Sequence, residues 1–428
     1  MEMKKKPVTA HGHNELGNTG FKSAISLLIS GLVVGLAAGV VVALFRLFSA
    51  WAYGQISALV KTQEHDPQFY MMLFGAYILL ALLVGVLISR FKAIRFGGSS
   101  WEKKALENEQ SQPLSTVLLP KFIGSCLVMG SGISVGGEGP SIEMGASTAL
   151  AIVEKYPSNH RNRDIFVYGG CAAGLAATFS APFGGIPLIF EKKMAKFSWR
   201  LILFLLAGAA GVWLSVMYLF GLEMLFPVTG QEPLKLSDYW ALVPLGIGCG
   251  FIGIIYASLM KCSKEIYSRI KILPEILHPL LPFLATALML LLYPLATGEG
   301  LNIVEHVAAD EYFLGPLLFF IVIKLFFTAF CYGSGIPAGL MVPLFCVGGV
   351  GGGIYFKIMN TASLLHGGLL MPCVLMGMAS AFAAAERAPI TSLVLVLEMT
   401  GALVYAPGLV ICVLLGLVTS LFMNANTV

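Results

Sequence analysis

The chain has 428 residues, 57% of them hydrophobic and only 12% charged, with a formal net charge of +4 at pH 7. A soluble domain carries roughly a quarter charged residues, so this composition excludes an ordinary soluble protein. Apolar runs long enough to cross a bilayer recur along the chain, which predicts a polytopic α-helical membrane protein of roughly ten or more segments. The clear runs are Ala24–Leu47, Met71–Ile88, Leu201–Phe220, Trp240–Leu259, Pro279–Leu295, Leu314–Cys331 and Leu403–Met423. Weaker runs, rich in glycine or broken by proline, are Val117–Val135, Ile142–Ile152, Val167–Phe190, Leu340–Tyr355 and Met371–Leu397.

The first 20 residues are polar and lack the apolar stretch of a cleavable signal peptide, so we expect a short cytoplasmic tail there. Charged residues between the apolar runs are sorted by sign. The positive-inside rule places the basic clusters in the cytoplasm and the acidic ones outside, which predicts a multi-pass protein of the cell membrane with a cytoplasmic N-terminus. The basic clusters are Arg90–Arg95 with Lys103–Lys104, Lys155–Arg163, Lys192–Arg200 and Lys261–Lys271, and the acidic clusters are Glu64–Asp66, Glu223–Asp238 and Glu299–Glu311.

Three glycine- and proline-rich segments interrupt the apolar pattern, and the first of them reads RFGGSSWEKKALENE, from Arg95 to Glu109. Its paired glycines and serines precede a short, charged helical segment. The hydroxyl of Ser99 or Ser100 is therefore a candidate donor to an anion. An ordinary helix N-cap explains the two serines equally well.

The second interruption, GSGISVGGEGPSIEMGA from Gly130 to Ala146, carries the strongest signal. A glycine-rich turn runs into Pro140, which suits the first turn of a helix because its missing N–H costs nothing there. The free N–H groups of that turn and the helix dipole form an anion site. Glu138 lies at the same helix start, so its ionised carboxylate can occupy the anion site and its protonated form can leave. The alternative is a surface helix cap, because acids favour helix N-termini.

A repeat follows, in which GGCAAGLAATFSAPFGGIPLIFE (Gly169–Glu191) resembles MGMASAFAAAERAPITSLVLVLE (Met376–Glu398), 207 residues later. In each copy a glycine precedes a proline by 12 residues, and that proline precedes the final glutamate by nine. An internal repeat in a membrane chain indicates two similar halves with a binding site where they meet. Chance similarity between two alanine-rich helices is the alternative.

The third interruption, CYGSGIPAGLMVPLFCVGGVGGG from Cys331 to Gly353, stands in the second half of the chain roughly where GGEGP stands in the first. Pro343 opens a helix here, and the apolar Met341 is at the position that matches Glu138. A broken helix is tolerated at membrane depth where it lines a cavity. A kinked helix without a ligand has the same sequence pattern.

The remaining reactive residues show no catalytic pattern. The eight cysteines are scattered through or beside apolar segments without metal-ligand spacing, and the seven histidines form no HExxH or similar motif. The sequence contains no P-loop, nucleophile elbow or dinucleotide fingerprint. We therefore expect no enzymatic activity, no cofactor, no metal ion and no nucleic-acid partner.

Together, the interruptions and the repeat resemble the CLC chloride channel and chloride–proton antiporter family. GSGISVGGEGPSIEMGA is similar to the G-[RK]-E-G-P signature of that family, and GSGIPAGLMVP to its second filter loop, G-x-F-x-P. GEGLN (Gly298–Asn302) fits the loop between these filters, and the two repeat copies fit its mid-chain and late helices. The resemblance spans about residues 21–423. It implies an all-α membrane fold of two inverted halves, about 21–222 and 240–423, with broken and re-entrant helices and no C-terminal CBS domains.

The resemblance also implies roles for the filter residues. Glu138 matches the external gating glutamate, and Gly137 stands where the family usually has a basic residue, which removes a local positive charge. Ser99 is the best match to a central serine, although GGSSW departs from the usual G-S-G-I-P. Met341 replaces the usual phenylalanine. The implied anion-binding residues are Ser99, Gly137, Gly139, Leu340, Met341 and Val342.

Lys192 falls at the position where antiporters of this family carry an internal glutamate that relays protons to the cytoplasm. A lysine is not an evident proton relay, so we expect proton coupling to be weak or absent, although the lysine can attract anions. Alternatively, its side chain snorkels to the headgroups beside Lys193. We expect no terminal helix with a pore tyrosine, because the sequence stops at Val428, soon after the last apolar run.

From this pattern we expect transmembrane transport of a small monovalent anion, with chloride as the first choice. The sequence leaves a proton-coupled antiporter and an uncoupled channel open, and a fluoride-exporting variant as a third option. An intramembrane enzyme would need a nucleophile–base pair or metal ligands at membrane depth, and a structural role would follow if the motif departures close the pathway. The expected partners are the anion, the lipid bilayer and a second copy of the chain.

Overall fold

A computed structural model describes residues 19–63, 66–97, 114–155, 162–228, 232–270, 273–365 and 367–423. The described residues are helical or lie in the turns between helices, and they contain no β-strand beyond one isolated bridge. Within these ranges, eight helices are long and apolar enough to cross a membrane. The predicted class, an all-α polytopic membrane protein, is confirmed.

The helices follow the apolar runs of the sequence and extend most of them by several residues. The first half contains α1 (Thr19–Thr62), α2 (Pro67–Arg90), η1 (Lys92–Ile94), α4 (Leu114–Gly130), α5 (Glu138–Lys155), α6 (Arg163–Phe179), α7 (Gly185–Glu191), α8 (Trp199–Val212) and η3 (Trp213–Leu219). The second contains η4 (Leu236–Ala241), α9 (Leu242–Arg269), η5 (Glu275–Leu277), α10 (Leu280–Leu292), η6 (Pro294–Ala296), α11 (Leu301–Ala308), α12 (Leu314–Gly333), α13 (Met341–Thr361), η7 (Gly367–Leu369), α14 (Leu370–Glu386), α15 (Pro389–Thr400), η8 (Leu403–Tyr405) and α16 (Ala406–Phe422).

Helix α1 has 44 residues and is therefore about 66 Å long. Since the hydrocarbon core of a bilayer is about 30 Å thick, α1 must cross it at a strong tilt. Other helices are too short to span alone: α7 has seven residues and α15 has 12. The broken helices that the glycine and proline pattern predicts are therefore present.

Corresponding helices make the same contact in the two halves. Helix α5 contacts α6 in the first half, and α13 contacts α14 in the second. Glycines bring both pairs close: a Cβ atom at Gly174 would strike the carbonyl oxygen of Ser141, and one at Gly352 would strike that of Cys373. The matched glycine spacing of the two repeat copies thus produces matched close helix contacts.

The glutamates that end the repeat copies bind across the two halves. Glu191, at the end of α7, accepts hydrogen bonds from the backbone amides of Ile390 (2.7 Å) and Thr391 (2.8 Å), in the first turn of α15. Glu398 in α15 accepts from the amide of Phe183, just before α7, at 3.0 and 3.2 Å. Each carboxylate thus satisfies free amides of the other copy, where a helix has no internal partners.

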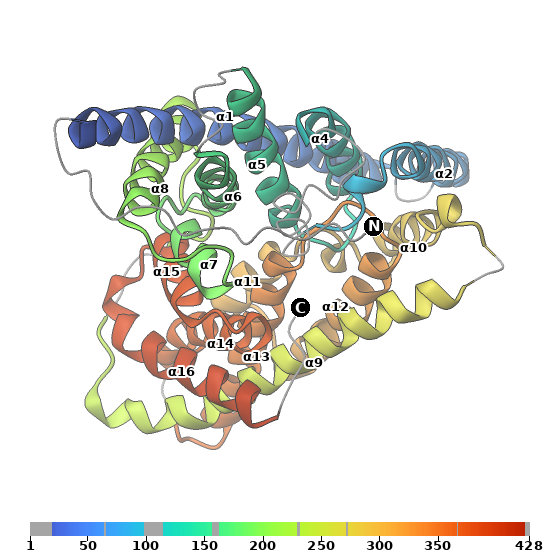
Figure 1. Cartoon of the computed structure of the whole chain (residues 1–428). Coiled ribbons are helices and arrows are strands. Elements are labelled where there is room, and N and C mark those ends of the chain that lie inside the picture. Colours follow the sequence, from blue (N-terminus) through green and yellow to red (C-terminus); the bar gives the residue numbers. More distant parts are fainter. Residues whose placement is uncertain are drawn as a thin grey trace, which may run out of the picture.

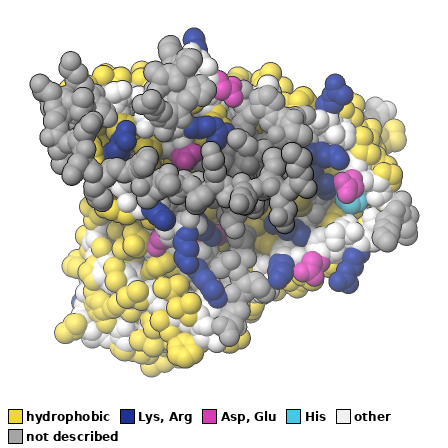
Figure 2. Space-filling view, viewed as in Figure 1, with side chains coloured by type: hydrophobic (Ala, Val, Ile, Leu, Met, Phe, Trp, Pro, Cys, Tyr) yellow, Lys and Arg dark blue, Asp and Glu magenta, His cyan; other side chains and the backbone are white. Residues whose placement is uncertain are grey.

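Figure 1 shows this arrangement: α1, α5, α6 and α8 gather in the upper part of the view, α9, α13, α14 and α16 in the lower part, and α7 meets α15 between them. Lys and Arg side chains gather across the face turned to the viewer in Figure 2. The described interruptions before α5 and α13 lie between the two groups of helices, and there the candidate site is found.

Candidate anion-binding site

The two filter loops of the sequence are joined by backbone hydrogen bonds at the centre of the protein. The amide of Gly136 donates to the carbonyl of Gly339 at 2.8 Å, and the amide of Gly339 donates to the carbonyl of Gly136 at 2.6 Å. This bridge stands directly before α5 and close before α13. The N-termini of two helices from different halves are therefore held beside each other.

Glu138 at the start of α5 reaches across to the start of α13. Its Oε1 accepts a hydrogen bond from the backbone amide of Met341, and the residue is 1% exposed. Its Oε2 has no hydrogen-bond partner among the described residues. A Cβ atom at Gly136 or Gly339 would strike this carboxylate, so a side chain at either position would displace it from its observed place. A carboxyl group therefore occupies an amide at a helix N-terminus, which is where a free anion binds.

The other predicted filter residues lie around this carboxylate. The amide of Gly137 donates to Oε1 of Glu299 at 3.0 Å. The carbonyl of Leu340 accepts the hydroxyl proton of Tyr256 in α9 at 2.8 Å, which fixes the loop before α13. A Cβ at Gly139 would lie 2.9 Å from the carbonyl oxygen of Ala338, so the loops touch without a side chain between them.

The described segment that precedes the predicted central serine ends at the same place. Gly97, the last described residue before it, packs against Gly139 and Ala338: a Cβ there would lie 2.7 Å from the Ala338 carbonyl oxygen. Ser99 itself lies outside the described residues, and its role stays a prediction. Lys121 of α4 holds the segment before it, because its ammonium donates to the carbonyl of Ile94 at 2.9 Å and to that of Phe96.

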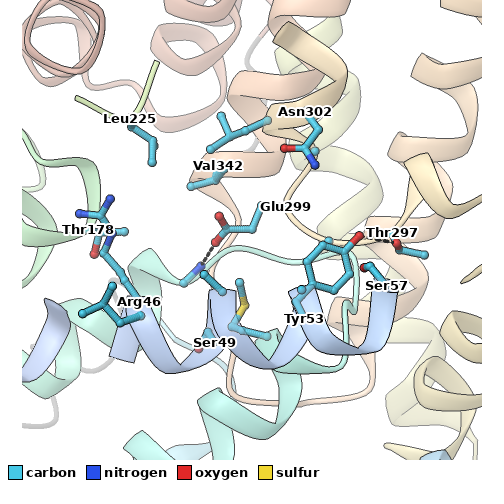
Figure 3. A pocket seen from close by; sticks show the side chains of 18 of the residues that line it. Arg46, Ser49, Tyr53, Ser57, Thr178, Leu225, Thr297, Glu299, Asn302 and Val342 are labelled. Atoms are coloured by element: carbon cyan, nitrogen blue, oxygen red, sulfur yellow. Dashed lines mark hydrogen bonds between the residues drawn. The ribbon is translucent and has the colours of Figure 1, made fainter. Parts of the chain in front are cut away.

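A cavity of about 760 Å³ leads to the filter. It is bounded by α1, by the loop between η6 and α11, and by the segment after η3. Figure 3 shows Glu299 in its centre, between Arg46 and Tyr53 of α1 and Val342 of α13. Gly137 and Val342 both line it, so the cavity touches the starts of α5 and α13.

Lys192, the residue at the predicted internal proton position, lies directly after α7 and forms an ion pair with Glu386. Its ammonium donates to the Glu386 carboxylate and, at 3.0 Å, to the Glu386 carbonyl. The side chains are 15% and 6% exposed. The ammonium is therefore held inside the protein and is not extended towards lipid headgroups.

Sequence reasoning missed five buried or half-buried charged residues. Glu386 pairs with Lys192, and Glu299 binds Gly137. Lys121 forms a buried ion pair with Glu143 of α5 at 2.5 Å. Lys324 of α12 is 1% exposed and donates to the carbonyl of Gly298. A charge within an apolar run was the available signal, because such residues in membrane proteins are rare and are paired.

The described part of the chain contains no group of three His, Cys, Asp or Glu side chains that could hold a metal ion. The chemistry that this arrangement offers is the competition of carboxylates and free anions for helix N-termini.

Comparisons with known proteins agree with this geometry. A family model described as "Voltage gated chloride channel" matches residues 80–421. The H(+)/Cl(-) exchange transporter ClcA of Salmonella typhimurium is 29% identical over 404 residues, which cover 89% of this chain and 82% of that protein. ClcA of Yersinia pestis is 28% identical over 401 residues, with 89% and 81% covered.

Two solved structures share the fold. A slow cyanobacterial Cl-/H+ antiporter superposes with a TM-score of 0.85 at 23% identity, covering 94% of this chain and 95% of its own. A CLC-type fluoride/proton antiporter superposes with a TM-score of 0.77 at 19% identity, covering 95% and 97%. The predicted CLC-like fold, with its two inverted halves, is confirmed.

Proposed function

The chain belongs to the voltage gated chloride channel family, and from this premise we propose that it transports chloride, or a similar small monovalent anion, across the cell membrane. The observation that carries the proposal is the hydrogen bond between Glu138 and the Met341 amide at the meeting point of two helix N-termini. Such a position binds negative charge. Glu138 is the gate, because an anion can use the Met341 amide only after the carboxylate has left it.

The direction of the pathway follows from the charge pattern. Helix α9 has 28 residues, about 42 Å, and joins the acidic cluster that ends at Asp238 to the basic cluster that begins at Lys261. At the basic end, Lys264 lies over the rings of Phe96 (5.1 Å) and Tyr332 (4.7 Å). The positive-inside rule makes this end cytoplasmic. The cavity is lined by Leu225 and Glu299, which belong to the segments Glu223–Asp238 and Glu299–Glu311 that the same rule places outside, so it opens to the outside.

Proton-coupled exchange is the second candidate, and the position of Glu386 favours it over an uncoupled channel. Lys192 alone offers no relay, but its ammonium holds a nearly buried carboxylate within the protein. The relatives described above carry the name H(+)/Cl(-) exchange transporter. A carboxylate can alternate between charged and neutral states, which a relay needs.

Efflux from proteoliposomes tests the proposal. The full chain is reconstituted in chloride-loaded vesicles, and chloride release and external pH are recorded together; fluoride-loaded vesicles test the alternative anion. We expect chloride efflux above that of protein-free vesicles. Glu138→Gln and Glu138→Ala should keep or raise this flux and abolish coupled proton movement, since the gate is then permanently empty.

Absence of chloride efflux from vesicles that contain correctly folded protein would contradict the proposed transport. Retained proton pumping in Glu138→Ala would contradict the role of Glu138. Faster fluoride than chloride release at equal gradients would assign the chain to fluoride export.

A further inference from the structure

Glu299 is a carboxylate at the filter that the gate described above does not use. It belongs to the short loop between η6 and α11, far along the chain from α5. Its Oε1 lies 3.0 Å from the amide nitrogen of Gly137, the residue directly before the gating glutamate. The side chain lines the cavity and is directed to the start of α5 (Figure 3).

The absence of a side chain at position 137 makes room for Glu299. A Cβ atom at Gly137 would lie 3.5 Å from Oε1 of Glu299 and 3.0 Å from the ring of Phe45. A long side chain there would therefore contend with Glu299 for the same space. Gly137, which stands where the family usually has a basic residue, thus leaves space that Glu299 occupies.

The loop presents Glu299 rigidly. Gly298 and Gly300 on either side have φ angles of +69° and +94°, a conformation that favours glycine. The ammonium of Lys324 donates to the carbonyl of Gly298. The hydroxyls of Tyr53 and Thr297 are hydrogen-bonded at 2.8 Å. These contacts fasten the loop on the side that precedes Glu299, and the glutamate lies over the Gly137 amide.

Charges of both signs surround the carboxylate. Arg46 and Lys324 attract its charged form, whereas the neighbouring Glu138 repels it. Burial raises the pKa of Glu299, while the Gly137 amide and the two cations act in the opposite direction. The charged or titratable groups around the loop and cavity are Arg46, Tyr53 and Lys61 of α1, Glu138 of α5, Lys324 of α12 and Cys346 of α13.

We propose that Glu299 is a second gating carboxylate, which competes with the transported anion for the Gly137 amide on the cavity side of Glu138. This proposal rests on the proposed anion transport. Two carboxylates then cover two amides along the pathway: Glu299 covers that of Gly137, at the start of α5, and Glu138 covers that of Met341, at the start of α13. An anion arriving through the cavity displaces Glu299 first and Glu138 second.

Protonation opens the outer gate. A neutral carboxyl group is a weaker acceptor for a backbone amide than a carboxylate, because charge-assisted hydrogen bonds are the stronger ones. It also no longer repels the anion. Acidification of the cavity side therefore frees the Gly137 amide and accelerates anion uptake from that side, independently of Glu138.

A structural cap is the competing explanation, since acids stabilise helix N-termini. A cap affects the melting temperature but neither the pH profile of transport nor anion affinity. Glu299→Gln separates the two explanations, because the amide side chain is nearly isosteric and still accepts a hydrogen bond but carries no charge. Glu305→Gln is the matched control, since Glu305 is an exposed glutamate on the adjoining α11.

The experiment measures two properties of the full chain: chloride efflux from proteoliposomes over external pH 4.5 to 8, and chloride binding to the detergent-purified protein by titration calorimetry at pH 7.5. In Glu299→Gln we expect efflux at pH 7.5 to rise to the level of the unmodified protein at low pH. We expect chloride to bind about tenfold more tightly, because a neutral amide competes for the Gly137 amide less strongly than a carboxylate and does not repel the anion. Proton coupling should persist, because Glu138 is intact, and Glu305→Gln should behave as the unmodified protein.

The calorimetric result keeps this proposal separate from the transport proposal. If the unmodified protein releases no chloride but Glu299→Gln binds it more tightly, transport is wrong and the competition of Glu299 with anions stands. If Glu299→Gln shows unchanged affinity and an unchanged pH profile, Glu299 is not a gate, whatever the flux of the unmodified protein.

Discussion

Thr391 donates two hydrogen bonds to Glu191, one from its backbone amide at 2.8 Å and one from its hydroxyl group at 2.6 Å. The last residue of the first repeat copy therefore caps the first turn of a helix in the second copy. Glu398 acts in the reverse direction on Phe183. The two repeat copies therefore hold the halves together through hydrogen bonds. Their final carboxylates, Glu191 and Glu398, are bound to backbone amides outside the anion site.

The first prediction follows from this cap. Glu191→Ala removes the acceptor for two amides and one hydroxyl at the start of α15, and we expect a loss of about 1–3 kcal/mol in stability. The melting temperature of the detergent-purified protein should fall, as measured by loss of the monodisperse peak after heating. Glu154→Ala, at an exposed glutamate near the end of α5, is the control and should melt as the unmodified protein does. Equal melting of both variants would show that the cap does not join the halves.

A second prediction concerns the glycine contact between α13 and α14. A Cβ at Gly352 would strike the backbone of Cys373, so Gly352→Ala must push the helices apart. We expect a loss of about 1–3 kcal/mol, typical of overpacking. Gly75→Ala in α2 is the control, because a Cβ there meets no atom within 4 Å. It should leave the melting temperature unchanged or raise it, since alanine favours helices by roughly 0.5–1 kcal/mol.

The melting temperatures of these two variants should differ in a definite direction, with Gly352→Ala the lower. Gly352→Ala and Gly75→Ala each add one methyl group to a helix of the same protein. They differ only in what surrounds that methyl group. If Gly352→Ala melts at or above the temperature of Gly75→Ala, the close approach of α13 to α14 is not what holds this half together.

Most of the fold was accessible from the sequence because its signals are local. Apolar runs set the helices, and glycine and proline set the breaks before α5 and α13. The helix-start position of Glu138 could also be predicted, since it depends on neighbours in the chain. Its contact with Met341, 203 residues away, was not predicted, although the family resemblance placed Met341 among the anion-binding residues.

The charged residues that sequence reasoning missed depend on contacts between distant segments. Glu299 is 162 residues from Gly137, and Glu386 is 194 residues from Lys192. Nothing in the spacing of either glutamate indicates its partner. They stand in glycine-rich and alanine-rich sequence, and only the packing of the two halves brings them to the filter or to α7.

A third prediction concerns assembly, which the sequence suggests through the apolar runs Leu201–Phe220 and Leu403–Met423. Helix α16 carries an exposed apolar stripe. Figure 1 places α16 at the lower left, and hydrophobic side chains cover the lower left of the same view in Figure 2. We expect a homodimer through α8 and α16, because apolar helix faces that pack in lipid can bury such a stripe. The residues of the stripe are Val410, Leu414, Val418 and Leu421, which are 39%, 51%, 43% and 53% exposed.

Single-molecule photobleaching in liposomes measures the assembly. The unmodified protein should bleach in two steps, and Leu414→Trp should increase the one-step fraction, since the larger ring disturbs the contact. Leu79→Trp on the exposed face of α2 is the control and should keep two steps. Bleaching of the unmodified protein in one step would contradict the dimer.

The last prediction concerns the pair of Lys192 and Glu386. A proton that travels between the cytoplasm and Glu138 needs a group that can bind and release it, and Glu386 supplies one where Lys192 does not. Tyr256 and Tyr332 are each near enough to both Glu386 and Glu138 to interact with them electrostatically. We therefore expect the unmodified protein to move protons against a chloride gradient.

Substitutions at both positions test this route in the same efflux assay with pH recording. Glu386→Gln should keep chloride flux and abolish proton movement, because the amide cannot exchange a proton. Lys192→Ala should keep both, since the acceptor stays in place. Lys192→Glu adds a second carboxylate beside Glu386, and it should strengthen coupling if the rest of the path exists. Stoichiometric proton movement in Glu386→Gln would show that water or another acid carries the proton. An unmodified protein that releases chloride without moving protons would instead be an uncoupled channel, in which Lys192 and Glu386 form a structural pair.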